Sequence, residues 1–290
     1  MTKIHPEFEK KEYTVQLHIS NDEFDEITKN INELKDHPNI LNPRMICRDE
    51  ANIPVLHYSV FANGSTLRNW INTLNQPTRK SIRTSFRLKP RMNHLDIMLQ
   101  LIDACEFMLS THMLTGQTCI NPDFIWVEYD ETNKFHVKLI NTVDTTTTNI
   151  CDYIHHDKNY WAPEILSKYS NIMFYSDMKN DDVHPILQTH ITKHKSQKVF
   201  KRYDTRPSTI SIVYSLGLIL YFIATNKDPY DGHRTTPTDR PYMLEMNLTL
   251  SKLIWNATEP DVKVRPTLQD WKQQITTISK SYTNKSCILM

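Results

Sequence analysis

Few residue patterns in this sequence could carry chemistry. Its four glycines stand far apart, so it contains no Gly-x-Gly-x-x-Gly loop to cradle phosphates. Its five cysteines include no Cys-x-x-Cys pair and are odd in number, which favours reduced thiols of an intracellular protein. His155 with His156, and His190 with His194, have spacings that zinc accepts. Such pairs arise by chance among thirteen histidines, and surface or loop positions are the favoured interpretation.

Two isolated carboxylates are the remaining chemical candidates. Asp123 lies just before a predicted strand at 124–127, and Asp144 follows a predicted strand at 135–140. A carboxylate in either place could bind a cation. A lone carboxylate beside a loop is more often a solvated or capping group, and this is the favoured interpretation of Asp123.

Length and charge narrow the class of protein. A chain of 290 residues is long enough for one large domain or a two-lobed unit with a substantial core. A net charge of +1 gives no electrostatic case for binding nucleic acid. We therefore expect a globular protein that does not bind nucleic acid.

The elements that must position any site centre on one apolar segment. Residues 209–224 are apolar all the way round and too few to span a bilayer, which predicts a buried helix ended by Pro229 and Gly232. A second core helix is predicted at 94–113. Before them, the pattern predicts strands at 13–19, 45–47 and 55–61 and helices at 21–35 and 66–74. The class expected is α+β.

Three landmarks in order along the chain resemble the C-terminal lobe of protein kinases. They imply a protein-kinase-like two-lobed fold with a truncated N-lobe at 1–62, a helical C-lobe at 63–281 carrying an insertion at about 168–206, and a tail at 282–290. In kinases the glutamate of the first landmark pairs with the arginine of the last. The landmarks are Trp161-Ala162-Pro163-Glu164, Tyr214-Ser215-Leu216-Gly217 and Arg265-Pro266-Thr267.

The same resemblance puts other residues where phosphoryl transfer needs its catalytic groups. The aligned residues are Leu17 for the phosphate-binding lysine, Thr118 for the catalytic aspartate, Asp123 for the magnesium-binding asparagine and Asn141 for the magnesium-binding aspartate. Leu17 supplies no cation, Thr118 cannot accept a proton, and a neutral amide is a poor magnesium ligand. The resemblance therefore implies a pseudokinase with no cofactor and no metal.

Within the kinases, the chain is similar to the mixed lineage kinase domain-like pseudokinases, whose virus-encoded members are truncated. That family carries a membrane-damaging four-helix bundle, whereas here the pseudokinase part begins almost at the first residue. The resemblance implies a non-catalytic inhibitor that binds a host receptor-interacting serine/threonine kinase and blocks phosphorylation of the necroptosis executioner. The residues that carry it are Pro38-Asn39-Ile40-Leu41, Ile46-Cys47 with Asp49-Glu50, Gly64-Ser65-Thr66-Leu67-Arg68, and Tyr214-Ser215 with Ile223-Ala224-Thr225.

The resemblance also assigns a partner-binding surface, formed by helix 21–35 and the hinge between the lobes. The residues expected there are Asp22, Asp25, Lys29 and Asn63. The last four residues, Cys287-Ile288-Leu289-Met290, match the signal for farnesylation of the cysteine. A cytosolic protein is expected, with peripheral membrane association if Cys287 is prenylated.

Two other functions remain open. In one, Asp123 and Asp144 support nucleotide binding and weak kinase activity. In the other, a prenyl-anchored scaffold binds an unrelated partner through the basic stretch 193–202 of the insertion, although a solvated loop is the favoured interpretation of that stretch.

Overall fold

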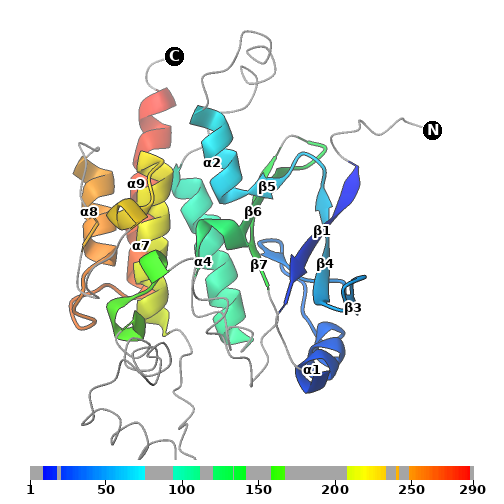
Figure 1. Ribbon diagram of the computed structural model, residues 1–290. Coiled ribbons are helices and arrows are strands. Elements are labelled where there is room, and N and C mark those ends of the chain that lie inside the picture. The colour runs from blue at the N-terminus through cyan, green and yellow to red at the C-terminus, as the bar shows by residue number, and fades with distance from the viewer. Residues whose placement is uncertain are drawn as a thin grey trace, which may run out of the picture.

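The computed structural model describes residues 9–17, 21–75, 94–111, 120–132, 134–141, 158–166, 208–232, 240–241 and 248–287. Two β-sheets lie on one side of this part of the chain, and the long helices α4, α7, α8 and α9 lie on the other (Figure 1). The predicted α+β class is confirmed. Within the described ranges, no helix is both long and apolar enough to cross a membrane.

The first sheet is antiparallel and has the strand order β1 (Lys10–Gln16), β4 (Pro54–Phe61), β3 (Met45–Arg48). Alternate residues of β4 point to opposite faces, so Leu56, Tyr58 and Val60 are at most 1% exposed while His57 and Ser59 face outward. Helix α1 (Asn21–Ile31) packs its buried Ile27 into the same cluster as Leu56. This sheet is therefore covered on one face and open to solvent on the other.

Two predicted boundaries in this region are wrong. The strand predicted at 13–19 runs from Lys10 to Gln16, because β4 extends to Phe61 and pairs with Lys10. The helix predicted to reach residue 35 ends at Ile31. After it, the backbone N–H groups of Glu33 and Leu34 bond three residues back instead of four, which tightens the chain out of the α-helix.

The second sheet has the order β2 (Ile40–Leu41), β7 (Phe135–Ile140), β6 (Ile125–Tyr129), β5 (Ser65–Thr66). β6 and β7 form a hairpin, and β2 runs parallel to β7 with Ile40 opposite Leu139. The segment after α1 thus joins a sheet whose other strands come from later in the chain. Helix α2 (Leu67–Asn75) begins directly after β5.

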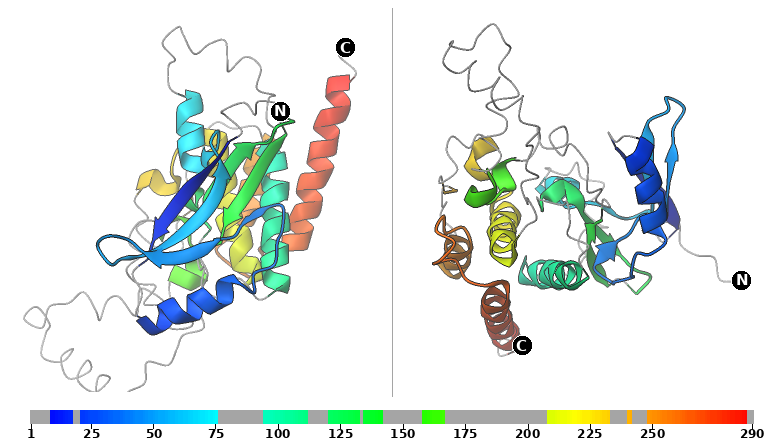
Figure 2. Two further views of the ribbon diagram at one scale, coloured as in Figure 1. Left: turned by 90° about the vertical axis from the view of Figure 1, so that its right-hand side faces the viewer. Right: turned by 90° about the horizontal axis from the view of Figure 1, so that it is seen from below.

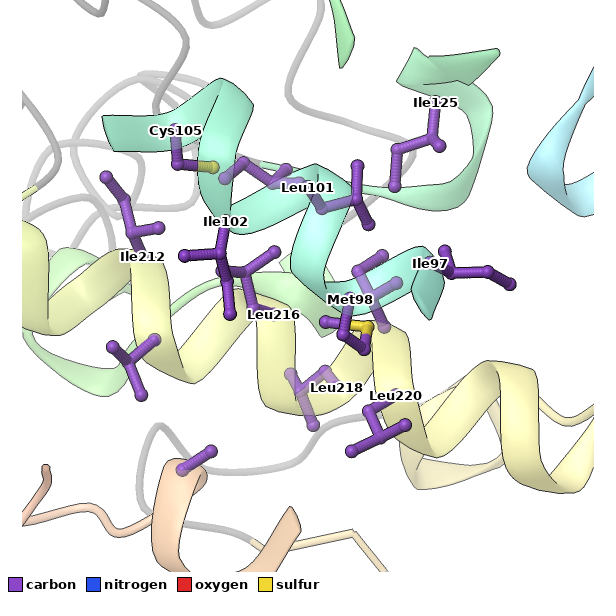
Figure 3. Close-up of a cluster of buried hydrophobic side chains, with 14 of the residues drawn as sticks. Ile97, Met98, Leu101, Ile102, Cys105, Ile125, Ile212, Leu216, Leu218 and Leu220 are labelled. Carbon is purple, nitrogen blue, oxygen red and sulfur yellow. The ribbon is translucent and has the colours of Figure 1, made fainter. Parts of the chain in front are cut away.

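Helix α7 (Thr209–Thr225) is the centre of the helical part, as predicted, and every residue from 211 to 223 is buried. Around it lie α4 (His94–Ser110), α8 (Leu248–Ala257) and α9 (Leu268–Cys287), whose axes are seen nearly end-on in the right-hand view of Figure 2. Side chains of α4 such as Met98 and Ile102 point toward α7, where Leu216 and Leu218 lie (Figure 3). Helix α4 ends at Ser110, three residues short of the prediction.

Local sequence explains both ends of α7. The Ser208 side chain accepts a hydrogen bond from the Ser211 backbone N–H at 3.1 Å, which caps the start. Asn226 adopts a left-handed conformation with φ of 53° and closes the end. A Cβ at Gly217 would lie 2.6 Å from the Cβ of Ala257, so the absence of a side chain lets α8 approach α7 closely.

Candidate functional site

The candidate site is built from the described residues that the sequence assigned to phosphoryl transfer: Leu17, Asp123 and Asn141. Leu17 directly follows β1 and is 5% exposed. Its backbone N–H donates to the Pro54 carbonyl at 2.8 Å, and its side chain belongs to the core cluster that includes Ile27. The position therefore contributes apolar packing and no charge.

Asn141 follows β7 and is 3% exposed. Its Nδ2 donates to Asn42 Oδ1 at 2.9 Å, and its backbone carbonyl accepts from the Tyr58 hydroxyl at 2.8 Å. Its backbone N–H donates to the Leu41 carbonyl at 3.0 Å. The Tyr58 bond ties the end of β7 to the first sheet. The side-chain amide instead bonds Asn42, which directly follows β2 of the second sheet.

Asp123 lies in the short 3₁₀ helix η2 (Pro122–Phe124), whose start is capped by the Asn121 side chain. The Asp123 side chain is 47% exposed, and its Oδ2 accepts from Arg68 Nε at 2.8 Å. An arginine at this distance competes with a cation for the carboxylate, which makes Asp123 a poorer ligand for a metal ion. Of the two roles favoured for Asp123, capping belongs to its neighbour Asn121, whereas the Asp123 carboxylate is half exposed.

Arg68 links Asp123 to a second acid that sequence reasoning missed. Its Nη1 bonds both carboxylate oxygens of Asp228, at 2.8 and 2.9 Å, and the Tyr160 hydroxyl donates to Asp228 at 2.9 Å. The Arg68 guanidinium also lies 5.3 Å from the centre of the Phe222 ring. Arg68 and its partners thereby hold four elements at one point. These are α2, η2, η5 (Lys158–Tyr160) and η6 (Pro229–Gly232), which follows Asp228.

The charges of this cluster support one another. Burial opposes the positive charge of Arg68, but its hydrogen bonds with Asp228 and Asp123 outweigh that cost and raise the pKa of Arg68 above its ordinary value. The negative charge of Asp123 also acts across to the first sheet. Burial raises the pKa of the Tyr13 hydroxyl, and the nearby Asp123 raises it further.

Aromatic rings fill the junction of the two sheets next to this cluster. The ring centre of Tyr13 lies 4.8 Å from Trp126 and 6.0 Å from Tyr58. The Trp126 Nε1 donates at 3.0 Å to Glu128, a carboxylate that is 1% exposed. Glu128 is compensated by Lys138 at 2.5 Å and by the Phe61 backbone N–H at 3.2 Å.

Asn63 and Gly64, in the segment that joins the two sheets, are held against this junction. The Asn63 side-chain amide donates to the Tyr129 carbonyl at 2.9 Å and accepts from the Tyr129 N–H at 3.3 Å. A Cβ on Gly64 would come within 2.4 Å of the Trp126 indole nitrogen, so only glycine fits there. The polar groups of the Asn63 side chain are thus bonded within the molecule.

The other residues assigned to partner binding lie on α1. Asp22, Asp25 and Lys29 are all exposed, while Ile27 on the opposite side is 1% exposed. Arg48 of β3 fastens the start of this helix through a 2.6 Å bond to the Asn21 side chain and lies 4.7 Å from the centre of the Phe24 ring. The helix therefore presents a charged face to solvent from a fixed position.

The structure brings Glu164 and Arg265 together, although 101 positions separate them in the chain. Their bidentate pair has N–O distances of 2.8 and 3.1 Å. The Arg265 side chain is 0% exposed and that of Glu164 is 28% exposed. Arg265 also donates to the carbonyls of Glu259 and Ile210 at 2.8 and 2.9 Å and lies 4.9 Å from the Tyr214 ring centre.

The remaining residues singled out from the sequence are outside what the structure describes. They include Thr118, Asp144, the four histidines with zinc-like spacing and the insertion 168–206. Cys287 is the last residue of α9, and its side chain and residues 288–290 are likewise not described. Among the described residues, no three His, Cys, Asp or Glu side chains are grouped to hold a metal ion.

No protein-family model matches this chain, and no curated protein matches it.

Proposed function

We propose that this chain is a catalytically inactive, protein-kinase-like protein that binds a host receptor-interacting kinase and keeps the necroptosis executioner unphosphorylated. The proposal has two parts, a lack of catalysis and a binding surface, which rest on different residues. It includes the finer fold assignment, with a smaller lobe at 1–62 and a helical lobe at 63–281.

One observation supports the lack of catalysis. Each described residue at a position aligned with phosphoryl transfer instead packs or bonds within the fold. Leu17 packs in the core, and the Asn141 amide bonds Asn42. Asp123 is paired with Arg68, which also bonds Asp228. A magnesium ion at Asp123 would have to compete with Arg68, which bonds Oδ2 at 2.8 Å and is part of this larger network. The weak-kinase alternative gains no support from this arrangement.

The kinase-like assignment is supported by two features that the resemblance predicts. One is the pair between Glu164 and the fully buried Arg265. Another is the uniformly buried α7, which begins beside that pair because Arg265 donates to the Ile210 carbonyl. Both belong to the frame of the helical part, and neither needs catalysis to be useful.

The binding part is proposed for the exposed side of α1. Its three charged residues, Asp22, Asp25 and Lys29, stand on a helix anchored by Ile27 and Arg48. A helix fixed in this way offers charge complementarity to a partner at little entropic cost. Asn63 can contribute its backbone and shape, because its side-chain amide is already bonded to Tyr129.

The test is co-purification from cells given a necroptotic stimulus, with phosphorylation of the executioner followed in parallel. The wild-type chain should capture the receptor-interacting kinase and reduce that phosphorylation. Asp22→Lys with Asp25→Lys should abolish both effects. The matched control reverses two exposed charges on and after α8, Lys252→Glu with Lys263→Glu, on the side of the molecule away from α1 (Figure 1), and should behave as wild type.

Two outcomes would reject the proposal. One is that no receptor-interacting kinase co-purifies and cell death is unaffected at high expression. The other is that the α8 control loses the effect while the α1 variant keeps it. The second result would move the interaction to a different face of the protein.

A further inference from the structure

Three side chains form a chain of contacts on the outer face of the first sheet. Cys47 lies on β3, His57 on β4 and Glu12 on β1. The Cys47 sulfur lies 2.9 Å from His57 Nε2, and His57 Nδ1 lies 2.5 Å from a carboxylate oxygen of Glu12. This group is separate from the Asp123 cluster and from the Glu164 pair, and the proposed function does not use it.

Strand register explains why the three meet. Cys47 pairs with Val55 and Glu12 pairs with Ser59, so each lies one diagonal step from His57, on opposite sides of it. Leu56 and Tyr58, the neighbours of His57 along β4, point to the core, so His57 must point outward. The contacts therefore follow from the pairing of all three strands.

The arrangement has the order of nucleophile, base and orienting acid. A carboxylate on Nδ1 keeps the proton on that nitrogen, which leaves Nε2 as an acceptor facing the thiol. The sulfur and the carboxylate contact opposite nitrogens of the ring, so they do not converge on one point as metal ligands would. The His57 side chain is 18% exposed and that of Glu12 is 60% exposed, and Cys47 is partly exposed.

Two other charged groups near this face are engaged elsewhere. The Lys10 ammonium lies 5.9 Å from the centre of the Phe61 ring. Asp49, in the turn between β3 and β4, accepts from Gln16 at 3.3 Å and from two backbone N–H groups of its own turn. Glu12 is thus the carboxylate that acts on His57.

We infer that Cys47 is a reactive thiol that exchanges with small disulfides such as glutathione disulfide. In the exchange, the Cys47 proton moves to His57 Nε2 and the sulfur attacks one sulfur of the disulfide. The original S–S bond breaks, a new S–S bond forms to Cys47, and the departing thiolate takes the proton from His57. One small thiol is released, and the disulfide is the only oxidant required. The product carries a bulky group on the open face of the first sheet.

The first experiment compares two cysteines of one chain. With Cys119, Cys151 and Cys287 replaced by serine, only Cys47 and Cys105 remain. Cys105 is 0% exposed in α4, and its burial raises the pKa of its thiol. The protein is incubated with glutathione disulfide near neutral pH, native or unfolded in urea, and modification of each cysteine is timed by peptide mass spectrometry.

Cys47 should react at least about tenfold faster in the native protein than in the unfolded one. In the native protein His57 can accept the thiol proton, whereas in the unfolded protein the thiol has no such acceptor and only a few per cent of an ordinary thiol is ionised near neutral pH. Cys105 should show the reverse order. If native Cys47 reacts no faster than unfolded Cys47, the inference is overturned, since accessibility without activation gives that result.

Two variants separate activation from structure. His57→Gln should slow modification of Cys47 by about tenfold near neutral pH, because the proton acceptor is lost. Glu12→Gln should slow it less and change the rate–pH profile, which a purely structural hydrogen bond would not do. Each variant is first checked for an unchanged unfolding temperature. An unchanged rate in folded His57→Gln would overturn the role of the histidine and with it the inference.

Discussion

We expect Arg265→Ala to lower the free energy of unfolding by about 3–5 kcal/mol, because the side chain it removes is fully buried and fully bonded. Arg265 is 0% exposed and makes two hydrogen bonds to Glu164. It also satisfies the carbonyls of Glu259 and Ile210. Truncation leaves all of these acceptors without their donor.

The size of this loss in unfolding free energy follows from the groups that remain after Arg265 is truncated. Breaking a buried pair costs about 3–5 kcal/mol, and the lower end applies because Glu164 is 28% exposed and regains water. Each orphaned carbonyl adds roughly 1 kcal/mol where water cannot reach it. In a protein of this size, about 4 kcal/mol corresponds to a fall of roughly 10 °C in the unfolding temperature.

The measurement is denaturant unfolding of wild type, Arg265→Ala and a matched control, Lys272→Ala. Lys272 also pairs with two acids, Asp103 at 2.8 Å and Glu106 at 2.5 Å, but its side chain is 32% exposed. Exposed pairs contribute about 0–1 kcal/mol, so the control should stay within about 1 kcal/mol of wild type. A loss for Arg265→Ala no larger than that of the control would refute the reasoning from burial.

Three other predictions concern nucleotide binding, the packing of α7 on α8, and stability at alkaline pH. ATP with magnesium should leave the unfolding temperature unchanged in a thermal-shift assay; a saturable stabilisation that Asp123→Asn removes would contradict the pseudokinase proposal. Gly217→Ala should cost about 1–3 kcal/mol in denaturant unfolding, because its Cβ would lie 2.6 Å from the Cβ of Ala257; an unchanged midpoint would contradict the close packing of α7 on α8. The pKa of Tyr13 is raised in the folded protein, so its contribution to stability is present below the tyrosine pKa of the unfolded chain, about 10, and is lost as pH rises above it. Tyr13→Phe should therefore reduce the loss of unfolding free energy that is measured in that alkaline range.

Local pattern was enough to predict most elements of this fold. The run at 209–224 is apolar on every side, and such a segment can only be a buried helix. Strand β7 was predicted with the bounds Phe135–Ile140 that it has. The predicted end of a strand was wrong where pairing with another strand sets its length. β1 is as long as its pairing with β4 allows, and its own alternation does not contain that information.

Side-chain networks depend on distances that no local pattern records. Arg68 and Asp228 are 160 positions apart, and nothing near either residue indicates the other. The Cys47, His57 and Glu12 contacts require the register of three strands, and a shift of one residue in either pairing would turn one member to the other face. The sequence by itself predicted the longer strands and the helices α1, α2, α4 and α7, because those follow from local periodicity and apolarity, but it did not predict β2, β5, α8 or α9. Only the tertiary structure decided which charges and nucleophiles meet, because that depends on how distant segments pack.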